Sequence, residues 1–214
     1  MAIRLAIFDI DGTLRRVRSP WWRLHEHLGT AEAAAAYAPM FERGEVSYDA
    51  WAQLDAALWR GRSRDEIALA LHANPLRDGA EALVAWLRER GVPCVAVSTG
   101  LAVFAEPTAA TLGLGEVVCN RLVFDGDVCR GEAEVCVTET SKGQVMADLL
   151  RRRQVSAADV VAFGDGPADV PMLRAAGIGV AVCPKHDTVR DAADYVVDDE
   201  PIDRVIPALA RHGV

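Results

Sequence analysis

The amino-acid sequence predicts a doubly wound α/β fold, in which helices cover both faces of a mainly parallel sheet. Short apolar runs of strand length alternate with helical patterns from about residue 77 onward, and this alternation is typical of a parallel sheet with right-handed crossovers. Another strand-like run opens the chain, and the segment 15–74 after it has only helical patterns. We therefore expect a Rossmann-like core formed by residues 1–14 and 75–214, with residues 15–74 as a small helical insertion after the first strand.

The composition is that of a folded globular protein. Of 214 residues, 51% are hydrophobic and 25% are charged, which suffices for a sizeable core. The net charge of −8 argues against nucleic-acid and anionic-membrane partners, because their phosphates would repel the chain. Five cysteines without C-x-x-C spacing indicate neither a disulfide framework nor a zinc site. No apolar run reaches membrane-spanning length, so we expect a cytoplasmic monomer or homodimer without a membrane partner.

The first predicted strand leads into a pair of acids. The apolar run Leu5–Phe8 is followed by Asp9 and Asp11, and Gly12 allows a sharp turn. Carboxylates at i and i+2 of an extended chain point the same way, so their repulsion must be offset by a cation or a shared proton. A calcium loop would need further alternating acids, which the sequence lacks after Gly12. Taken alone, an ordinary strand-to-loop turn remains an alternative.

The segment 15–74 has the apolar spacing of amphipathic helices. Four tryptophans recur there at helical intervals, and we interpret them as the core of the segment rather than as a substrate platform; they are Trp21, Trp22, Trp51 and Trp59. The run 31–38 is rich in alanine, a strong helix former. Ser47 and Ser63 are plausible N-caps. The basic cluster at residues 15–18 is either a solvated loop or a rim that attracts an anionic substrate.

The rest of the chain alternates regularly. The sequence predicts helices over 77–90, 104–112 and 142–153, strands over 92–97, 117–119, 160–163, 178–182 and 195–197, and a hairpin over 122–128 with an Asp-Gly turn. Ligands bind such sheets at the carboxyl ends of the strands. The polar residues that follow the apolar runs should therefore meet at one edge.

The residues that meet there suit phosphoryl transfer. They are Asp9, Asp11, Ser98, Thr99, Gly100, Lys142, Asp165 and Asp169. Several carboxylates in one crevice favour a hard divalent cation, most of all Mg²⁺. Ser98 and the backbone N–H groups of Thr99 or Gly100, which we expect at a helix start, can bind phosphate oxygens, and Lys142 can neutralise them. Asp9 directly ends the strand and is the better nucleophile candidate, whereas Asp11 suits an acid/base role.

These motifs resemble the haloacid dehalogenase-like superfamily. Its four motifs are present in order: Asp-Ile-Asp-Gly-Thr-Leu at 9–14, Ser98 after an apolar strand, Lys142, and Gly-Asp-Gly-x-x-Asp at 164–169. The resemblance implies a first-type (C1) helical cap over 15–74, with Asp9 as nucleophile and Asp11 as general acid/base. It further implies that Thr13 supports the loop and that Ser98 and Lys142 bind phosphate. The Mg²⁺ ligands that it implies are Asp9, Asp11, Asp165, Asp169 and the Ile10 carbonyl. Because Asp11 is present, it favours phosphatase chemistry on a small phosphorylated metabolite.

Within the superfamily the sequence is most similar to phosphoserine phosphatases, with two departures in the cap. Where those enzymes carry a glutamate that meets the substrate ammonium, this chain has Arg18, and their carboxylate-binding arginine falls at Asp55. Candidates to compensate for these changes are Glu26, Arg43 and Arg60. Ala168 replaces a common asparagine. These departures predict a substrate other than L-phosphoserine; the alternatives are a true L-phosphoserine phosphatase of serine biosynthesis, a phosphotransferase, and a regulatory protein that binds a phosphate ligand without turnover.

Overall fold

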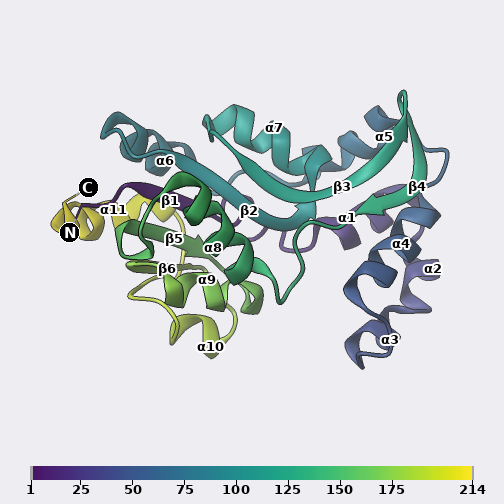
Figure 1. Cartoon of the computed structure of the whole chain (residues 1–214). Coiled ribbons are helices and arrows are strands. Elements are labelled where there is room, and N and C mark those ends of the chain that lie inside the picture. The colour runs from purple at the N-terminus through teal and green to yellow at the C-terminus, as the bar shows by residue number, and fades with distance from the viewer. Residues whose placement is uncertain (1, 214) are drawn as a thin grey trace.

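The computed structural model describes residues 2–213, which form a seven-stranded sheet with helices on both faces (Figure 1). The strand order is β4-β3-β2-β1-β5-β6-β7. The strands are β1 Leu5–Phe8, β2 Cys94–Leu101, β3 Val117–Asp125, β4 Val128–Glu134, β5 Val160–Gly164, β6 Ile178–Val182 and β7 Tyr195–Val197. All neighbours pair in parallel except β3 and β4, which form an antiparallel hairpin. This arrangement confirms the predicted fold class.

The central strand β1 is buried on both faces, as a parallel sheet requires. Ala6 and Phe8 contribute to one hydrophobic cluster and Leu5 and Ile7 to the other, because successive side chains of a strand point to opposite faces. Phe8 stacks on Phe163 of β5, with the ring centroids 4.4 Å apart. The end of β1 is therefore held rigidly.

Helices from both halves of the chain cover the two faces. Residues of α6 Ala80–Glu89 and α7 Ala102–Leu112 belong to the first cluster. Residues of α8 Lys142–Arg153, α9 Val170–Ala175 and α10 Asp187–Arg190 belong to the second. The remaining elements are α11 Ile206–Leu209 and the short 3₁₀ helices η1 Leu69–Ala73, η2 Ala157–Asp159, η3 Pro167–Asp169, η4 Ile202–Val205 and η5 Ala210–His212. No helix in the described part of the chain is long and apolar enough to cross a membrane.

The inserted segment 15–74, between β1 and α6, consists of helices joined by turns. Its helices are α1 Pro20–Leu28, α2 Ala31–Ala35, α3 Ala38–Glu42, α4 Tyr48–Leu58 and α5 Arg64–Ala68. Residues of α1, α4 and α5 pack with the β3–β4 hairpin around a third hydrophobic cluster that contains Trp21 and Trp59. Trp51 packs against this cluster and is partly buried, whereas Trp22 is 41% exposed, so the prediction of core tryptophans is wrong for Trp22. Ser47 and Ser63 cap α4 and α5 through their side chains. In Figure 1, α2, α3 and α4 lie beyond the sheet, at the end where the hairpin projects.

Three predicted element boundaries need correction. The alanine-rich run forms two helices, because Pro39 lacks an N–H and its ring would clash inside one continuous helix. Strand β2 continues through Leu101, and α7 begins only at Ala102, so Thr99 and Gly100 lie in the strand and not at a helix start. Strand β3 runs unbroken into the hairpin, since one stretch pairs first with β2 and then with β4.

Candidate active site

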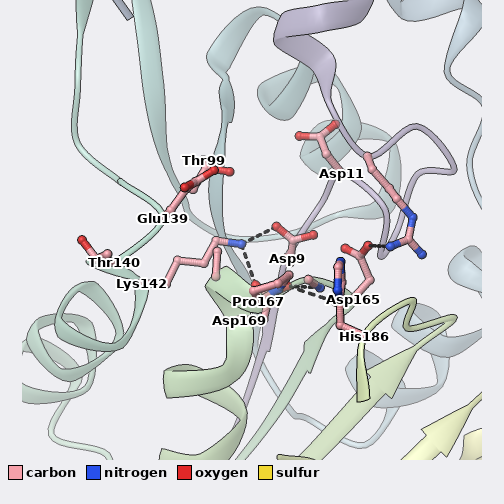
Figure 2. Close-up of a pocket in the computed structure, with 13 residues that line it drawn as sticks. Asp9, Asp11, Thr99, Glu139, Thr140, Lys142, Asp165, Pro167, Asp169 and His186 are labelled. Carbon is pink, nitrogen blue, oxygen red and sulfur yellow. Dashed lines mark hydrogen bonds and ion pairs between the residues drawn. The ribbon is translucent and has the colours of Figure 1, made fainter. Parts of the chain in front are cut away.

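Six of the eight residues predicted to meet at the sheet edge line a cavity of about 580 Å³. The other two, Ser98 and Gly100, are not in its wall. Figure 2 shows the side chains of Asp9, Lys142 and Asp169 pointing toward one another, with Asp165 beside them. Further residues of the wall are Glu139, Thr140, Gly166, Pro167, Ala168 and His186. The carboxyl ends of β1 and β5 thus supply the acids, and the start of α8 supplies the lysine.

Lys142 is a buried cation between two carboxylates. Its Nζ lies 2.5 Å from Asp9 Oδ1 and 2.6 Å from Asp169 Oδ1, and the side chain is only 2% exposed. Burial alone would lower the pKa of Lys142, but the charges of Asp169 and Asp9 raise this pKa above its usual value. The ammonium group therefore stays charged and fixes both carboxylates.

Asp169 organises the loop after β5. Its Oδ2 accepts hydrogen bonds from the backbone N–H groups of Asp165 and Gly166, each at 3.0 Å. Asp165 in turn accepts the Thr13 hydroxyl at 3.3 Å. Gly12, at φ +96°, packs directly against Asp165, where a Cβ would overlap the carboxylate. The first motif and the last are thereby locked together.

Asp9 has one carboxylate oxygen left over. Oδ1 is held by Lys142, whereas the buried Oδ2 has no hydrogen-bond partner among the described residues. Asp9, Asp165 and Asp169 each offer an oxygen, and these three atoms lie within 4.8 Å of one another. Such a group of hard oxygen donors fits a divalent cation.

The other predicted metal ligands lie differently. Asp11 is outside this group of three; its Oδ2 accepts the Ser98 hydroxyl at 3.3 Å. The Ile10 carbonyl accepts the N–H groups of Leu14 and Arg15, at 2.9 and 2.8 Å. The Ile10 oxygen is therefore already engaged in the turn.

The predicted phosphate-binding residues border the same acids. Ser98 is buried, and its hydroxyl accepts the backbone N–H of Gly100 at 2.9 Å. Gly100 lies so close to Asp11 that a Cβ would overlap the Asp11 carboxylate. The end of β2 therefore faces Asp11, with Thr99 in the cavity wall.

The protonation of these acids is shifted by burial. Burial, with the neighbouring Asp9 charge, raises the pKa of Asp11 to about 7. Burial raises the pKa of Asp9 to about 6 against the opposing effect of Lys142. Burial, together with Asp9 and Asp169, raises the pKa of Asp165 to about 8, although Arg18 opposes the shift. Near neutral pH, these carboxyl groups can therefore both donate and accept protons.

The basic cluster at residues 15–18 separates in the structure. Arg15 is buried and donates to Thr108 and Asn74, and the exposed Arg16 pairs with acids away from the acidic cavity. Only Arg18 lines that cavity, with Nη1 at 2.8 Å from Asp165 Oδ2. A single arginine therefore forms the basic rim at the acids.

The two remaining cap candidates do not line this cavity. Arg43 is exposed and pairs with Glu45. Asp55 is buried within the helical segment, where it accepts the Tyr37 hydroxyl at 2.6 Å. Neither lies in the wall around Asp9.

The sequence did not indicate the role of the Thr99 backbone carbonyl, which connects the helical segment to the core through hydrogen bonds. The Thr99 carbonyl accepts three donors: Trp21 Nε1 at 3.0 Å, Tyr48 Oη at 3.1 Å and Asn120 Nδ2 at 2.9 Å. Asn120 is fully buried and also bonds the backbone of Val137. The available signal was a polar residue between the predicted strand 117–119 and the predicted hairpin 122–128. Glu139, Thr140 and His186 were likewise not singled out for the cavity.

Comparison with known proteins gives consistent matches. A model of the haloacid dehalogenase-like hydrolases matches residues 6–174. The phosphoserine phosphatase of Halobacterium salinarum is 36% identical over 212 residues, covering 98% of this chain and 99% of that protein. The phosphoserine phosphatase of Methanocaldococcus jannaschii is 22% identical, covering 95% and 96%. A solved structure described as a phospho-aspartyl intermediate analogue of phosphoserine phosphatase aligns with a TM-score of 0.81 at 22% identity, covering 97% of this chain and 99% of that chain.

Proposed function

Because this chain belongs to the haloacid dehalogenase-like hydrolases and is a phosphatase of the phosphoserine phosphatase-like group, we propose that it hydrolyses a small phosphomonoester through an aspartyl-phosphate on Asp9. The observation that carries this proposal is the buried, unpartnered Oδ2 of Asp9 beside the Lys142-bound Oδ1. The Asp9 carboxylate is held in place through Oδ1, which leaves Oδ2 free to attack phosphorus.

The proposed reaction has two steps, formation of the aspartyl-phosphate and its hydrolysis. Asp9 Oδ2 attacks phosphorus, the bond from phosphorus to the ester oxygen breaks, and Asp11 gives its proton to the leaving oxygen. Asp11 then removes a proton from water, which attacks the same phosphorus and releases inorganic phosphate from Asp9. The pKa of Asp11, raised to about 7 by burial and by the Asp9 charge, suits both transfers near neutral pH.

The phosphoryl group would be bound from two sides. We assign its oxygens to Ser98, to the N–H groups of Thr99 or Gly100, and to Lys142. Mg²⁺ would be held by Asp9, Asp165 and Asp169, whose oxygen donors lie within 4.8 Å of one another. When bound, it would neutralise negative charge on the phosphoryl oxygens. Residues 15–74 would act as a cap that excludes water over the substrate.

The substrate class is tested with a panel of phosphomonoesters in the presence of Mg²⁺. The panel contains L-phosphoserine, sugar phosphates and nucleotides. L-Phosphoserine is the second candidate because relatives with full-length coverage are named phosphoserine phosphatases. A clear lead for L-phosphoserine would support that candidate, whereas a lead for another ester would support altered specificity at Arg18 and Asp55.

Asp9→Asn tests the nucleophile. The variant keeps the shape of the side chain but removes the attacking anion, so we expect turnover to fall at least about 10³-fold with the fold retained. Circular dichroism checks the fold, and an acid-quenched sample of the wild-type protein should carry one phosphoryl group on the Asp9 peptide. Retained activity in Asp9→Asn would refute the assignment.

A further inference from the structure

Arg18 pairs with an acid that the proposed metal site needs. Its Nη1 lies 2.8 Å from Asp165 Oδ2, while Asp165 Oδ1 accepts the Thr13 hydroxyl at 3.3 Å. Asp165 is only 4% exposed and is one of the three acids whose oxygens lie within 4.8 Å of one another. A guanidinium group and a divalent cation on one buried carboxylate repel each other. Arg18 and such a cation therefore compete for Asp165.

The charges around the three acids favour the same conclusion. Asp9, Asp165 and Asp169 carry three negative charges when all are ionised. Lys142 and Arg18 contact these acids as cations. A bound divalent cation would then leave the group with a net positive charge, whereas without Arg18 the same charges balance. Release of Arg18 therefore removes an unfavourable charge from a buried site.

Arg18 can leave its acid more easily than the other cation can. Lys142 is 2% exposed and is held by two carboxylates, at 2.5 and 2.6 Å. The Arg18 side chain is 32% exposed and also lines a separate pocket outside the acidic cavity, together with Cys183 and Lys185. The guanidinium group can therefore move away from Asp165 and remain hydrated.

The backbone on both sides of Arg18 is fixed, so the side chain is the part that moves. Val17 N donates to Asn74 Oδ1 at 2.9 Å, and the Ser19 side chain caps α1. Arg18 Nη2 donates to the backbone carbonyl of Cys183 at 2.5 Å. This second hydrogen bond can hold the guanidinium group at the rim of the cavity after the pair with the acid opens.

We propose that Arg18 is an internal cation that competes with Mg²⁺, lowers the affinity of the site for the metal, and is released from Asp165 when the metal binds. This inference rests on the proposed function, since it takes the three acids as metal ligands. Release leaves a guanidinium group at the cavity wall, where a second anionic group on the substrate can bind it. Metal binding therefore prepares the site for such a substrate.

Magnesium binding alone tests this inference. Mg²⁺ is titrated calorimetrically into the intact wild-type protein and into Arg18→Gln at about pH 9, where protons compete little with the metal. We expect Arg18→Gln to bind Mg²⁺ at least about tenfold more tightly, because a repelling charge is removed. Arg16→Gln is the matched control. This exposed arginine pairs with Asp78 and Glu200, so its loss should change the affinity less than about twofold.

Proton binding works against the expected gain. Burial raises the pKa of Asp165 to about 8, and Arg18 opposes this shift. Loss of Arg18 therefore favours the protonated acid, which binds metal less well, so a gain in affinity cannot come from protonation. Equal or weaker Mg²⁺ binding by Arg18→Gln, while the wild type binds Mg²⁺, would overturn this inference and leave the phosphatase proposal intact. No Mg²⁺ binding by either protein would refute the metal site and this inference with it.

Thermal unfolding separates competition from a purely structural role. Arg18→Gln should lower the melting temperature in EDTA and lower it less in saturating Mg²⁺, because the wild-type protein has then given up the pair with Asp165. An equal loss under both conditions would mean that Arg18 acts only on the fold, and would refute the competition.

Two further variants test whether charge is the cause. Arg18→Lys keeps the positive charge and should bind Mg²⁺ more weakly than Arg18→Gln does. A gain in Arg18→Lys as large as that in Arg18→Gln would contradict the charge argument. Should Arg18→Gln not fold, Arg18→Met removes the charge from a side chain of similar length and should show the same gain of at least about tenfold.

Discussion

Asp11 is the residue whose charge depends most clearly on the fold around it. It is 8% exposed, and the reference pKa of 3.8 rises to about 7 in the folded protein because of burial and then because of Asp9. The folded state therefore binds a proton more tightly than the unfolded state does. Stability from this group is fully present below about pH 4 and is lost as the pH rises through about 7.

We therefore expect metal-free protein to become less stable as the pH is raised from about 4 to 8. The loss at Asp11 should be on the order of 1 to 4 kcal/mol. Urea unfolding of Asp11→Asn should show a flatter pH dependence, with the gain in stability largest at pH 8 and absent at pH 4. The exposed Asp125→Asn is the matched control. An identical pH profile for Asp11→Asn and wild type would contradict the shifted pKa.

Arg18 is the residue most suited to read a second anionic group on the substrate. It lines the acidic cavity, its side chain is 32% exposed, and it pairs with Asp165. If the substrate carries a carboxylate, Arg18→Ala should raise KM about tenfold or more and lower kcat less, because the contact acts on binding. Steady-state kinetics with L-phosphoserine and with phosphoethanolamine, which lacks the carboxylate, test this directly. Unchanged kinetics with both esters would refute the role.

At the scale of elements, β2 is connected to the helical segment through one carbonyl. The Thr99 carbonyl accepts hydrogen bonds from the side chains of Trp21 in α1, Tyr48 in α4 and Asn120 in β3. A wall residue of the catalytic cavity is thereby fixed by two helices of the insertion. Since Asn120 also bonds the backbone at Cys136 and Val137, it places the loop that leads to Lys142.

Removing Asn120 should be costly. Asn120→Ala leaves several buried polar groups without partners, each at about 1 to 3 kcal/mol, so we expect a loss of at least about 2 kcal/mol in the free energy of unfolding. Tyr48→Phe removes one donor and should cost less, about 0.5 to 1.5 kcal/mol. Gln144→Ala, at an exposed position of α8, controls for the loss of an amide. A change in Asn120→Ala no larger than that control would contradict this account.

At the scale of the whole molecule, the chain passes from the core into the insertion near residue 15 and returns near residue 75. Backbone hydrogen bonds join these two connecting segments to each other. Arg16 N donates to Pro75 O at 3.1 Å, and Arg77 N donates to Leu14 O at 2.8 Å. Asn74 Oδ1 accepts the N–H of Val17 at 2.9 Å. These bonds lie at both ends of the segment 15–74, which supports the proposed cap boundaries. If the cap moves as a unit, we expect the hinge to lie within residues 18–73, beyond these hydrogen-bonded connecting segments.

The insertion also adds a second, smaller cavity to the molecule. The larger cavity combines buried acids with Lys142 and Arg18, whereas the wall of the smaller one includes Phe41, Trp51 and Asp55. The two cavities are lined by different residues. The carbonyl of Thr99, a residue in the wall of the larger cavity, accepts hydrogen bonds from Trp21 of α1 and Tyr48 of α4.

Much of the fold and of the acidic site could be predicted from the sequence alone. Strand and helix periods are local properties, so β5, β6, β7 and α8 were predicted at or within one residue of their bounds. The position of Asp9 and Asp165 at one edge followed from the rule that parallel strands end together. Element ends were less certain: β2 extends through Leu101 because pairing with β3 continues past Val97, which no local pattern reveals.

The sequence by itself determined the α/β fold class, the family resemblance and which acids meet, because short motifs at strand ends carry that information. Only the tertiary structure decided which groups each side chain contacts. Arg15, Arg16 and Arg18 are nearly adjacent in the chain yet go to the core, the surface and the site. His25 and Asp55 are thirty positions apart, on helices whose packing alone brings them to 3.0 Å. The physical reason is that burial and pairing depend on distances between elements, which local periodicity does not encode.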